Sequence, residues 1–144
     1  MSLSTSDQLL PDFRRLFNSA PARYIVVDRQ WRIVAVTDSA IAGTGLKRED
    51  ILGKVVTDVF RDNPDDPTAN GSQVLRDALE RVVNERAGHT LPVQRYDIEI
   101  NGVFEERYWQ PLNEPVFDDS GAVEFIIHGV EDVTASMKSG TVRG

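Results

Sequence analysis

The sequence contains no cysteine, only two histidines, and no long hydrophobic run. Without cysteine the chain forms no disulfide, no thiolate metal site, no cysteine nucleophile and no chromophore linkage through sulfur. A membrane-spanning helix needs about 20 mainly apolar residues, and no stretch of this chain approaches that length. No charged, apolar and cleavable leader is visible either, so the sequence predicts a cytoplasmic location.

Basic charge is also scarce, because 16 Lys and Arg face 23 Asp and Glu, for a net charge of −7. No block of basic residues compensates, and such a surface repels a phosphate backbone, so nucleic acid is not an expected partner. With 144 residues, 40% of them hydrophobic, the chain suits one ordered domain better than two domains or a disordered segment.

The residues of common catalytic motifs are missing. Neither His89 nor His128 lies in a recognisable nucleophile context, and the sequence has no Gly-x-Ser-x-Gly elbow. Gly43 and Gly45 do not extend to a dinucleotide fingerprint, since Arg48 occupies the third glycine position, and no phosphate-binding loop is present. The sequence therefore predicts no catalytic residues in this fragment.

A metal site is not predicted either. Acidic residues gather between positions 58 and 66, but they lack the alternating spacing and the glycine of a calcium loop. Aspartate and proline are common in turns, so a solvated acidic loop is expected over residues 62–67.

The first third of the chain predicts one helix and one hairpin. Apolar residues recur at helical spacing near the N-terminus, with Pro11 expected in the first turn of the helix. These residues are Leu9, Leu10, Phe13, Leu16 and Phe17. Residues 23–28 and 31–37 are rich in β-branched and aromatic side chains, and the short gap between them indicates a tight hairpin.

The middle of the chain predicts short helices and one longer helix. Residues 38–60 contain short helical pieces, with Asp38 or Ser39 as a cap and Gly53 as a left-handed C-cap. A longer helix is expected from an N-cap at Ser72 to a stop at Gly88.

The last third predicts strands. Residues 91–100 and 103–108 flank Asn101-Gly102, a strong hairpin signal, and a turn at 118–121 precedes a strand over 122–130. This order of elements favours an α+β fold with an antiparallel sheet covered by helices on one face.

Several segments together resemble a PAS domain, also called a sensory box. The resemblance covers roughly residues 11–134, and Asp38 departs from it because many relatives carry asparagine there. It is strongest at 115–121 and at Glu131-Asp132-Val133-Thr134, which is similar to the motif with which PAS domains pass to a downstream signalling helix. The other matching segments are 24–28, 32–36 and 48–54.

The resemblance implies a PAS fold: a five-stranded antiparallel sheet, short helices and one longer helix on one face, and an additional N-terminal helix. It also implies a pocket between sheet and helices, and a role as input module of a bacterial sensor or hybrid histidine kinase. On this basis we expect an expression remnant or an N-terminal flanking segment over 1–10, the PAS domain over 11–134, and the start of a linker to an output domain in cis over 135–144.

The cofactors of relatives are not expected here. A cysteinyl-flavin adduct needs a cysteine, and haem-binding relatives place a histidine on the long helix, where this sequence has none. No feature of the sequence points to a noncovalently bound flavin. The sequence thus predicts no haem and no cysteinyl-flavin, and it leaves the identity of any noncovalent small-molecule ligand open.

Polar and aromatic residues on the last strands are the ligand-pocket candidates. Counting back from Asn101-Gly102 pairs Tyr96 with Arg107 and places Trp109 on the same face, where the guanidinium suits a bound carboxylate. The alternative is that Arg107 stacks over Tyr96 on an exposed face and only stabilises the hairpin. The candidates are Tyr96, Arg107, Trp109, Asn113 and His128.

Signal relay is expected at the end of the domain. The Asp132 carboxylate is expected to accept hydrogen bonds from backbone N–H groups, and Thr134 is expected to cap the following helix. The apolar stripe of the N-terminal helix predicts a homodimer through that helix. Two functions stay open: a sensory module that regulates a linked output domain, and a purely structural dimerisation unit without ligand.

Overall fold

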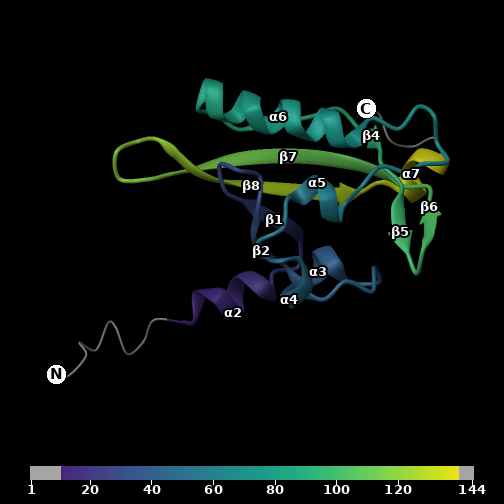
Figure 1. The fold of residues 1–144 in the computed structure, drawn as a ribbon, viewed down its shortest axis with the longest axis horizontal. Coiled ribbons are helices and arrows are strands. Elements are labelled where there is room, and N and C mark those ends of the chain that lie inside the picture. The colour runs from purple at the N-terminus through teal and green to yellow at the C-terminus, as the bar shows by residue number, and fades with distance from the viewer. Residues whose placement is uncertain (1–10, 140–144) are drawn as a thin grey trace.

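The computed structural model describes residues 11–139 and contains one main antiparallel sheet (Figure 1). Its strand order is β2-β1-β8-β7-β3, and β4 pairs with β7 as well. Because β3 and β4 follow one another along the same edge of β7, the sheet is five strands wide, as expected. The strands are β1 (Arg23–Val27), β2 (Ile33–Val36), β3 (His89–Thr90), β4 (Gln94–Arg95), β7 (Tyr108–Phe117) and β8 (Val123–Asp132).

A separate two-stranded hairpin consists of β5 (Ile98–Ile100) and β6 (Val103–Glu105). Asn101 and Gly102 form its turn with φ values of 51° and 81°, as this dipeptide requires in a tight hairpin. The predicted pairing is confirmed, since the Tyr96 N–H donates to the Arg107 carbonyl at 3.0 Å. The predicted single strand over 91–100 is wrong, because the ladder is interrupted around Asp97.

The helices lie mainly on one face of the sheet. In Figure 1 the long helix α6 lies alongside β7, and α2 projects away from the sheet. The helices are α2 (Phe13–Asn18), α3 (Asp38–Ile41), α4 (Arg48–Ile51), α5 (Val56–Val59), α6 (Gly71–Glu85) and α7 (Thr134–Ser139). No helix within residues 11–139 is long and apolar enough to cross a bilayer.

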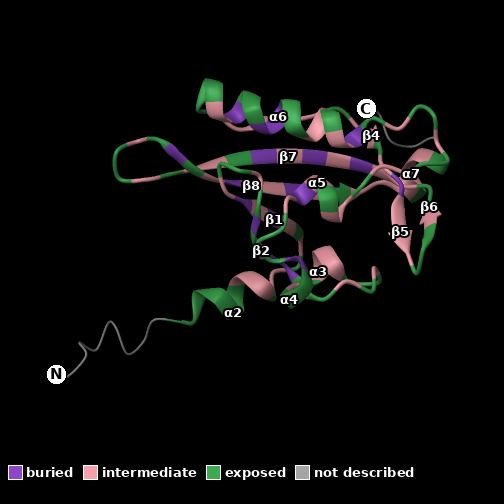
Figure 2. Cartoon of the chain, viewed as in Figure 1, coloured by how far each residue is buried: buried purple, intermediate pink, exposed green. Residues whose placement is uncertain are grey.

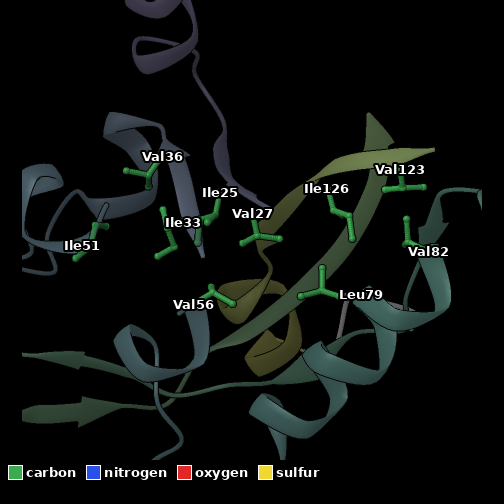
Figure 3. Close-up of a cluster of buried hydrophobic side chains, with 10 residues drawn as sticks. All are labelled: Ile25, Val27, Ile33, Val36, Ile51, Val56, Leu79, Val82, Val123 and Ile126. Carbon is green, nitrogen blue, oxygen red and sulfur yellow. The ribbon is translucent and has the colours of Figure 1, made fainter. Parts of the chain in front are cut away.

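The hydrophobic core lies between the sheet and these helices (Figure 3). On α6, Leu79 and Val82 are fully buried three residues apart, so one face of the helix packs on the sheet while the other is exposed (Figure 2). Opposite them are the strand residues of the core, and α4 and α5 close its other end. The core residues are Ile25, Val27, Ile33, Val36, Ile51, Val56, Leu79, Val82, Val123 and Ile126.

Two helix starts differ from the sequence prediction. Helix α2 begins at Phe13, because the Asp12 carboxylate accepts hydrogen bonds from the N–H groups of Arg14 and Arg15 at 3.0 and 3.3 Å. Pro11 therefore precedes the helix, while Leu9, Leu10 and the flanking segment 1–10 lie outside the described residues. Helix α3 is capped by Thr37 in place of Asp38 or Ser39. The Thr37 hydroxyl accepts from the N–H of Ala40 at 3.3 Å.

The ends of α6 also differ. The helix begins at Gly71, and the Asp62 carboxylate, not a Ser72 cap, accepts the Ser72 N–H at 3.0 Å. The helix ends at Glu85, with Arg86 as a left-handed C-cap at φ 52°, and does not extend to a stop at Gly88. The Arg86 guanidinium donates to the Gly121 carbonyl and lies over the Phe117 ring at 5.6 Å, which compensates part of the cost of this conformation. Gly53 is left-handed, as predicted, with φ 86°.

Candidate functional site

A cavity of about 310 Å³ lies between the sheet and the helices. That volume is at the lower end of the range of about 300–1,000 Å³ in which proteins bind small molecules. Most of its lining is aliphatic or aromatic, including Val56, Val59, Phe60, Val74, Leu75 and Ile98 from α5, α6, β5 and the turn after α5.

Strand register brings the sheet residues of the cavity onto one face. Asp132 of β8 is the direct partner of Trp109 on β7, and Val130 is the partner of both Pro111 and Arg23. Directly opposed residues in antiparallel strands share a face, so these side chains all point toward the helices. All five line the cavity.

Tyr96 and Trp109 form part of the cavity wall with their polar atoms already bonded. The Trp109 indole N–H donates to the Tyr96 carbonyl at 2.7 Å, and the Tyr96 hydroxyl donates to the carbonyl of Phe60. Burial, reinforced by the nearby Asp62 charge, raises the pKa of Tyr96. Both rings therefore act as fixed walls, and Arg23 stacks on Trp109 with its guanidinium 5.7 Å from the ring centre.

Arg107 lines the cavity, but its guanidinium is already engaged by carboxylates. It lies 2.5 Å from an oxygen of Glu105 and 3.6 Å from an oxygen of Asp132. Within residues 11–139 the arginines that stack on rings are Arg23, Arg61 and Arg86, so the alternative in which Arg107 stacks over Tyr96 is not observed.

His128 and Asn113 form a polar pair in which Asn113 is buried and His128 half-buried. His128 lines the cavity, whereas Asn113 is fully buried beside it, outside the lining. The His128 Nδ1 and the Asn113 Oδ1 are 2.7 Å apart, and the Asn113 Nδ2 has no hydrogen-bond partner. Burial lowers the pKa of His128 to about 4, so the imidazole is neutral near pH 7.

Asp97 is a polar anchor that the sequence analysis did not identify. It is only 5% exposed and accepts two hydrogen bonds from Arg95, at 2.9 and 3.1 Å, and one from Asn63 at 2.9 Å. Burial opposes its ionisation, but these hydrogen bonds outweigh burial and lower the pKa of Asp97. The anchor ties the loop before α6 to the strands at the cavity. The only signal in the sequence was an Arg-x-Asp spacing on one face of an expected strand.

The exit of the domain joins Asp132 to Thr134. The Asp132 Oδ1 accepts the N–H of Thr134 at 2.9 Å, while its Oδ2 faces Arg107. Burial raises the pKa of Asp132, but its bonds to Thr134 and the charges of Arg107 and Arg23 outweigh burial and lower it overall. The Thr134 hydroxyl does not act as the expected cap. It accepts the N–H of Tyr108 at 2.8 Å and so fastens the start of α7 to β7.

The structure thus brings together four of the five pocket candidates, Tyr96, Arg107, Trp109 and His128, and adds Asp132 to them. Asn113 lies outside the lining and contacts His128 through its Oδ1. Within the described part of the chain, no three His, Asp or Glu side chains gather as metal ligands.

Several solved structures have a similar fold. One is a sensory box sensor histidine kinase from Vibrio cholerae, with 16% identity, a TM-score of 0.58, and coverage of 90% of this chain and 94% of that one. The PAS domain of Bordetella pertussis BvgS has 18% identity and a TM-score of 0.55, over 89% and 90% of the two chains. A Rhodobacter sphaeroides LOV protein has 17% identity and a TM-score of 0.62, over 84% and 65%.

At these identities the likenesses concern the fold. None of the curated proteins matches the chain. The sequence profile of the PAS domain family matches residues 21–135, which is most of the chain. The chain belongs to the PAS domain family.

Proposed function

We propose that this PAS domain is a cytoplasmic sensory and signal-relay module of a bacterial protein. It takes a small molecule into the cavity and regulates an output domain linked in cis, for which a histidine kinase is the first candidate. PAS domains are sensory modules and in general not catalysts, and one structurally similar chain is a sensory box histidine kinase.

The observation that carries this proposal is the position of Asp132. One of its carboxylate oxygens holds the first N–H of α7, and the other faces Arg107 in the lining of the cavity. A ligand that packs against this wall and shifts the guanidinium of Arg107 relative to Asp132 alters the electrostatics beside Asp132 and therefore the hydrogen bond at the start of α7. Occupancy of the cavity is thereby coupled to the order of the helix that leaves the domain.

A second copy of the chain completes the module in this proposal. Phe13 and Leu16 of α2 are 65% and 54% exposed, and no residue of that helix is buried within the domain. Such apolar side chains favour packing against the same helix of a partner. In the dimer, the two α7 helices and the chains that follow them then respond together to occupancy of the cavity.

Native mass spectrometry of freshly purified protein tests the proposal. The wild-type chain should carry the additional mass of a small molecule, and Val130→Phe, which fills the cavity, should not. Glu131→Phe is the matched control, because Glu131 is exposed on the opposite face of the same strand.

The alternative, a structural dimerisation unit without ligand, predicts another spectrum. Wild type and both variants would then appear only as simple multiples of the 16.1 kDa chain, without excess mass. That result would contradict the sensory proposal, while leaving the homodimer intact.

A further inference from the structure

The charges that line the cavity are balanced. The lining contains three arginines, at positions 23, 61 and 107, and three carboxylates, at positions 97, 99 and 132. Arg61 is paired with Glu99 at 2.9 Å, and Asp97 is held by Arg95. An anionic ligand would have to break such a pair and leave a carboxylate behind, which is unfavourable in a partly desolvated site.

Arg107 therefore does not offer the carboxylate site that the sequence suggested. Glu105 lies 2.5 Å from its guanidinium and Asp132 lies 3.6 Å from it, so two carboxylates already balance its positive charge. Arg23 stacks on Trp109 and also lowers the pKa of Asp132 by its charge. Arg107 therefore leaves no free positive charge for a ligand anion, and the guanidinium of Arg23 is occupied by the ring of Trp109.

His128 is a polar residue of the cavity lining whose hydrogen-bonding state the structure defines. The Asn113 Oδ1 only accepts hydrogen bonds, so the His128 Nδ1 at 2.7 Å must carry the proton. Burial lowers the pKa of His128 to about 4, and a neutral imidazole has a single N–H. Nε2 is therefore an unprotonated acceptor in a residue that lines the cavity.

The size of the cavity limits the ligand further. A volume of about 310 Å³ corresponds to roughly ten water molecules at about 30 Å³ each. The lining is mainly apolar and includes the rings of Phe60, Tyr96 and Trp109. A ligand of about ten non-hydrogen atoms with one or two fused rings has the matching volume and surface.

We propose that the cavity selects a small, uncharged, mainly apolar ring compound that donates one hydrogen bond to Nε2 of His128. This inference rests on the proposed sensory function and deepens it, because it names the chemical class of the ligand. It also assigns His128 the role of specificity residue, held in one tautomer by Asn113.

Three matched probes test the class of ligand: indole, which donates through its N–H; benzofuran, which has the same shape without a donor; and indole-2-carboxylate, which is anionic. Affinities are measured by titration of the ¹⁵N-labelled protein at pH 7. Indole should bind about three- to tenfold more tightly than benzofuran, the range expected for one buried hydrogen bond. Indole-2-carboxylate should bind more weakly than both.

Two variants locate the discrimination. In His128→Leu the difference between indole and benzofuran should disappear. In Val130→Ala, a change in the same wall of the cavity without loss of a polar group, the difference should persist. If His128→Leu fails to fold, the histidine side-chain ¹⁵N shifts of the wild-type protein replace it, and a proton on Nε2 of His128 would overturn the proposal.

The outcomes separate this inference from the function on which it rests. Equal affinity for indole and benzofuran, or preference for the anion, would refute the ligand class while the cavity remained a binding site. Failure of all three probes to shift any cavity resonance, together with no excess mass in the native spectrum, would refute the sensory proposal itself.

Discussion

Replacing Gly71 by alanine tests whether close packing at the start of α6 fixes Tyr96 in the cavity wall. Gly71 is buried, and a Cβ atom there would lie 2.6 Å from Cε2 of Tyr96 and closer still to Cδ2. The ring must move, and the hydrogen bond from its hydroxyl to the Phe60 carbonyl is lost or weakened.

The expected magnitude follows from these contacts. Overpacking costs about 1–3 kcal/mol and a lost hydrogen bond about 0.5–1.5 kcal/mol, whereas replacing glycine returns about 0.4–1 kcal/mol through the unfolded chain. Gly71→Ala should therefore lower the free energy of unfolding by about 1–3 kcal/mol. For a domain of this size each kcal/mol lowers the Tm by about 4 °C, so a melting curve followed by circular dichroism measures the effect.

Gly88→Ala is the matched control. The three atoms nearest to a Cβ atom at Gly88 belong to the carboxylate of Glu114, an exposed and flexible side chain that can turn into solvent at little cost. Its stability should stay within about 0.5 kcal/mol of wild type. If Gly71→Ala melts like Gly88→Ala, the ring of Tyr96 is not fixed by this packing and the reasoning fails.

Four further predictions concern pH, association, relay and colour. The pKa of His128 is lowered from 6.5 to about 4, so the unfolded chain binds its proton first. The contribution of His128 to the free energy of unfolding should be fully present above pH 6.5 and should fall by up to about 3 kcal/mol as the pH drops to 4. Denaturant titrations of His128→Leu should not show this loss. Phe13→Asp should sediment as a monomer at concentrations where wild type is a dimer, and equal sedimentation as monomers would contradict the α2 interface. Asp132→Ala should keep the fold, at a cost of about 0.5–2 kcal/mol, while kinase activity of the full-length parent no longer responds to stimulus; a wild-type response would remove the relay role. Absorbance spectra of purified protein should show neither a Soret band nor a flavin band, and either band would show that the cavity holds a different group.

Local turn chemistry made much of the fold predictable. Asn101-Gly102 identified the β5–β6 hairpin and set the register that pairs Tyr96 with Arg107, because only a few residue pairs adopt positive φ at both positions. Gly53 equally indicated a left-handed residue at the end of a short helix. The full length of β7 was not predicted, since Pro111 and Pro115 lie within it and proline normally argues against a central strand.

Helix capping was less predictable, because it depends on side chains that are distant in sequence. The Ser72 N–H is bound by Asp62, which lies 10 residues earlier in the chain, so a search for a local cap could not find it. Likewise, the Thr134 hydroxyl accepts the N–H of Tyr108 on strand β7, and the N–H of Thr134, at the start of α7, is bound by Asp132 instead. Tertiary structure decides which of several competent side chains makes such a bond.

The chemistry of the cavity could be predicted only in part. Register placed Arg107 and Trp109 near Tyr96, but the partners of Arg107 could not be chosen among 23 acidic residues. The structure shows Glu105 and Asp132 at its guanidinium, and these contacts are the basis on which we propose an uncharged ligand. The tautomer of His128 depends on Asn113, its partner on the neighbouring strand, and this pairing could be known only from the folded structure.

Hydrogen exchange at the exit of the domain tests the central claim most directly. The amides of Val133 and Thr134 are bonded to Tyr108 and Asp132, and their exchange is measured with and without saturating indole. The account predicts that occupancy changes exchange both at the cavity wall and at these two amides, and that Asp132→Ala removes only the second change. A change confined to the cavity wall in the wild-type protein would contradict the coupling of ligand to output.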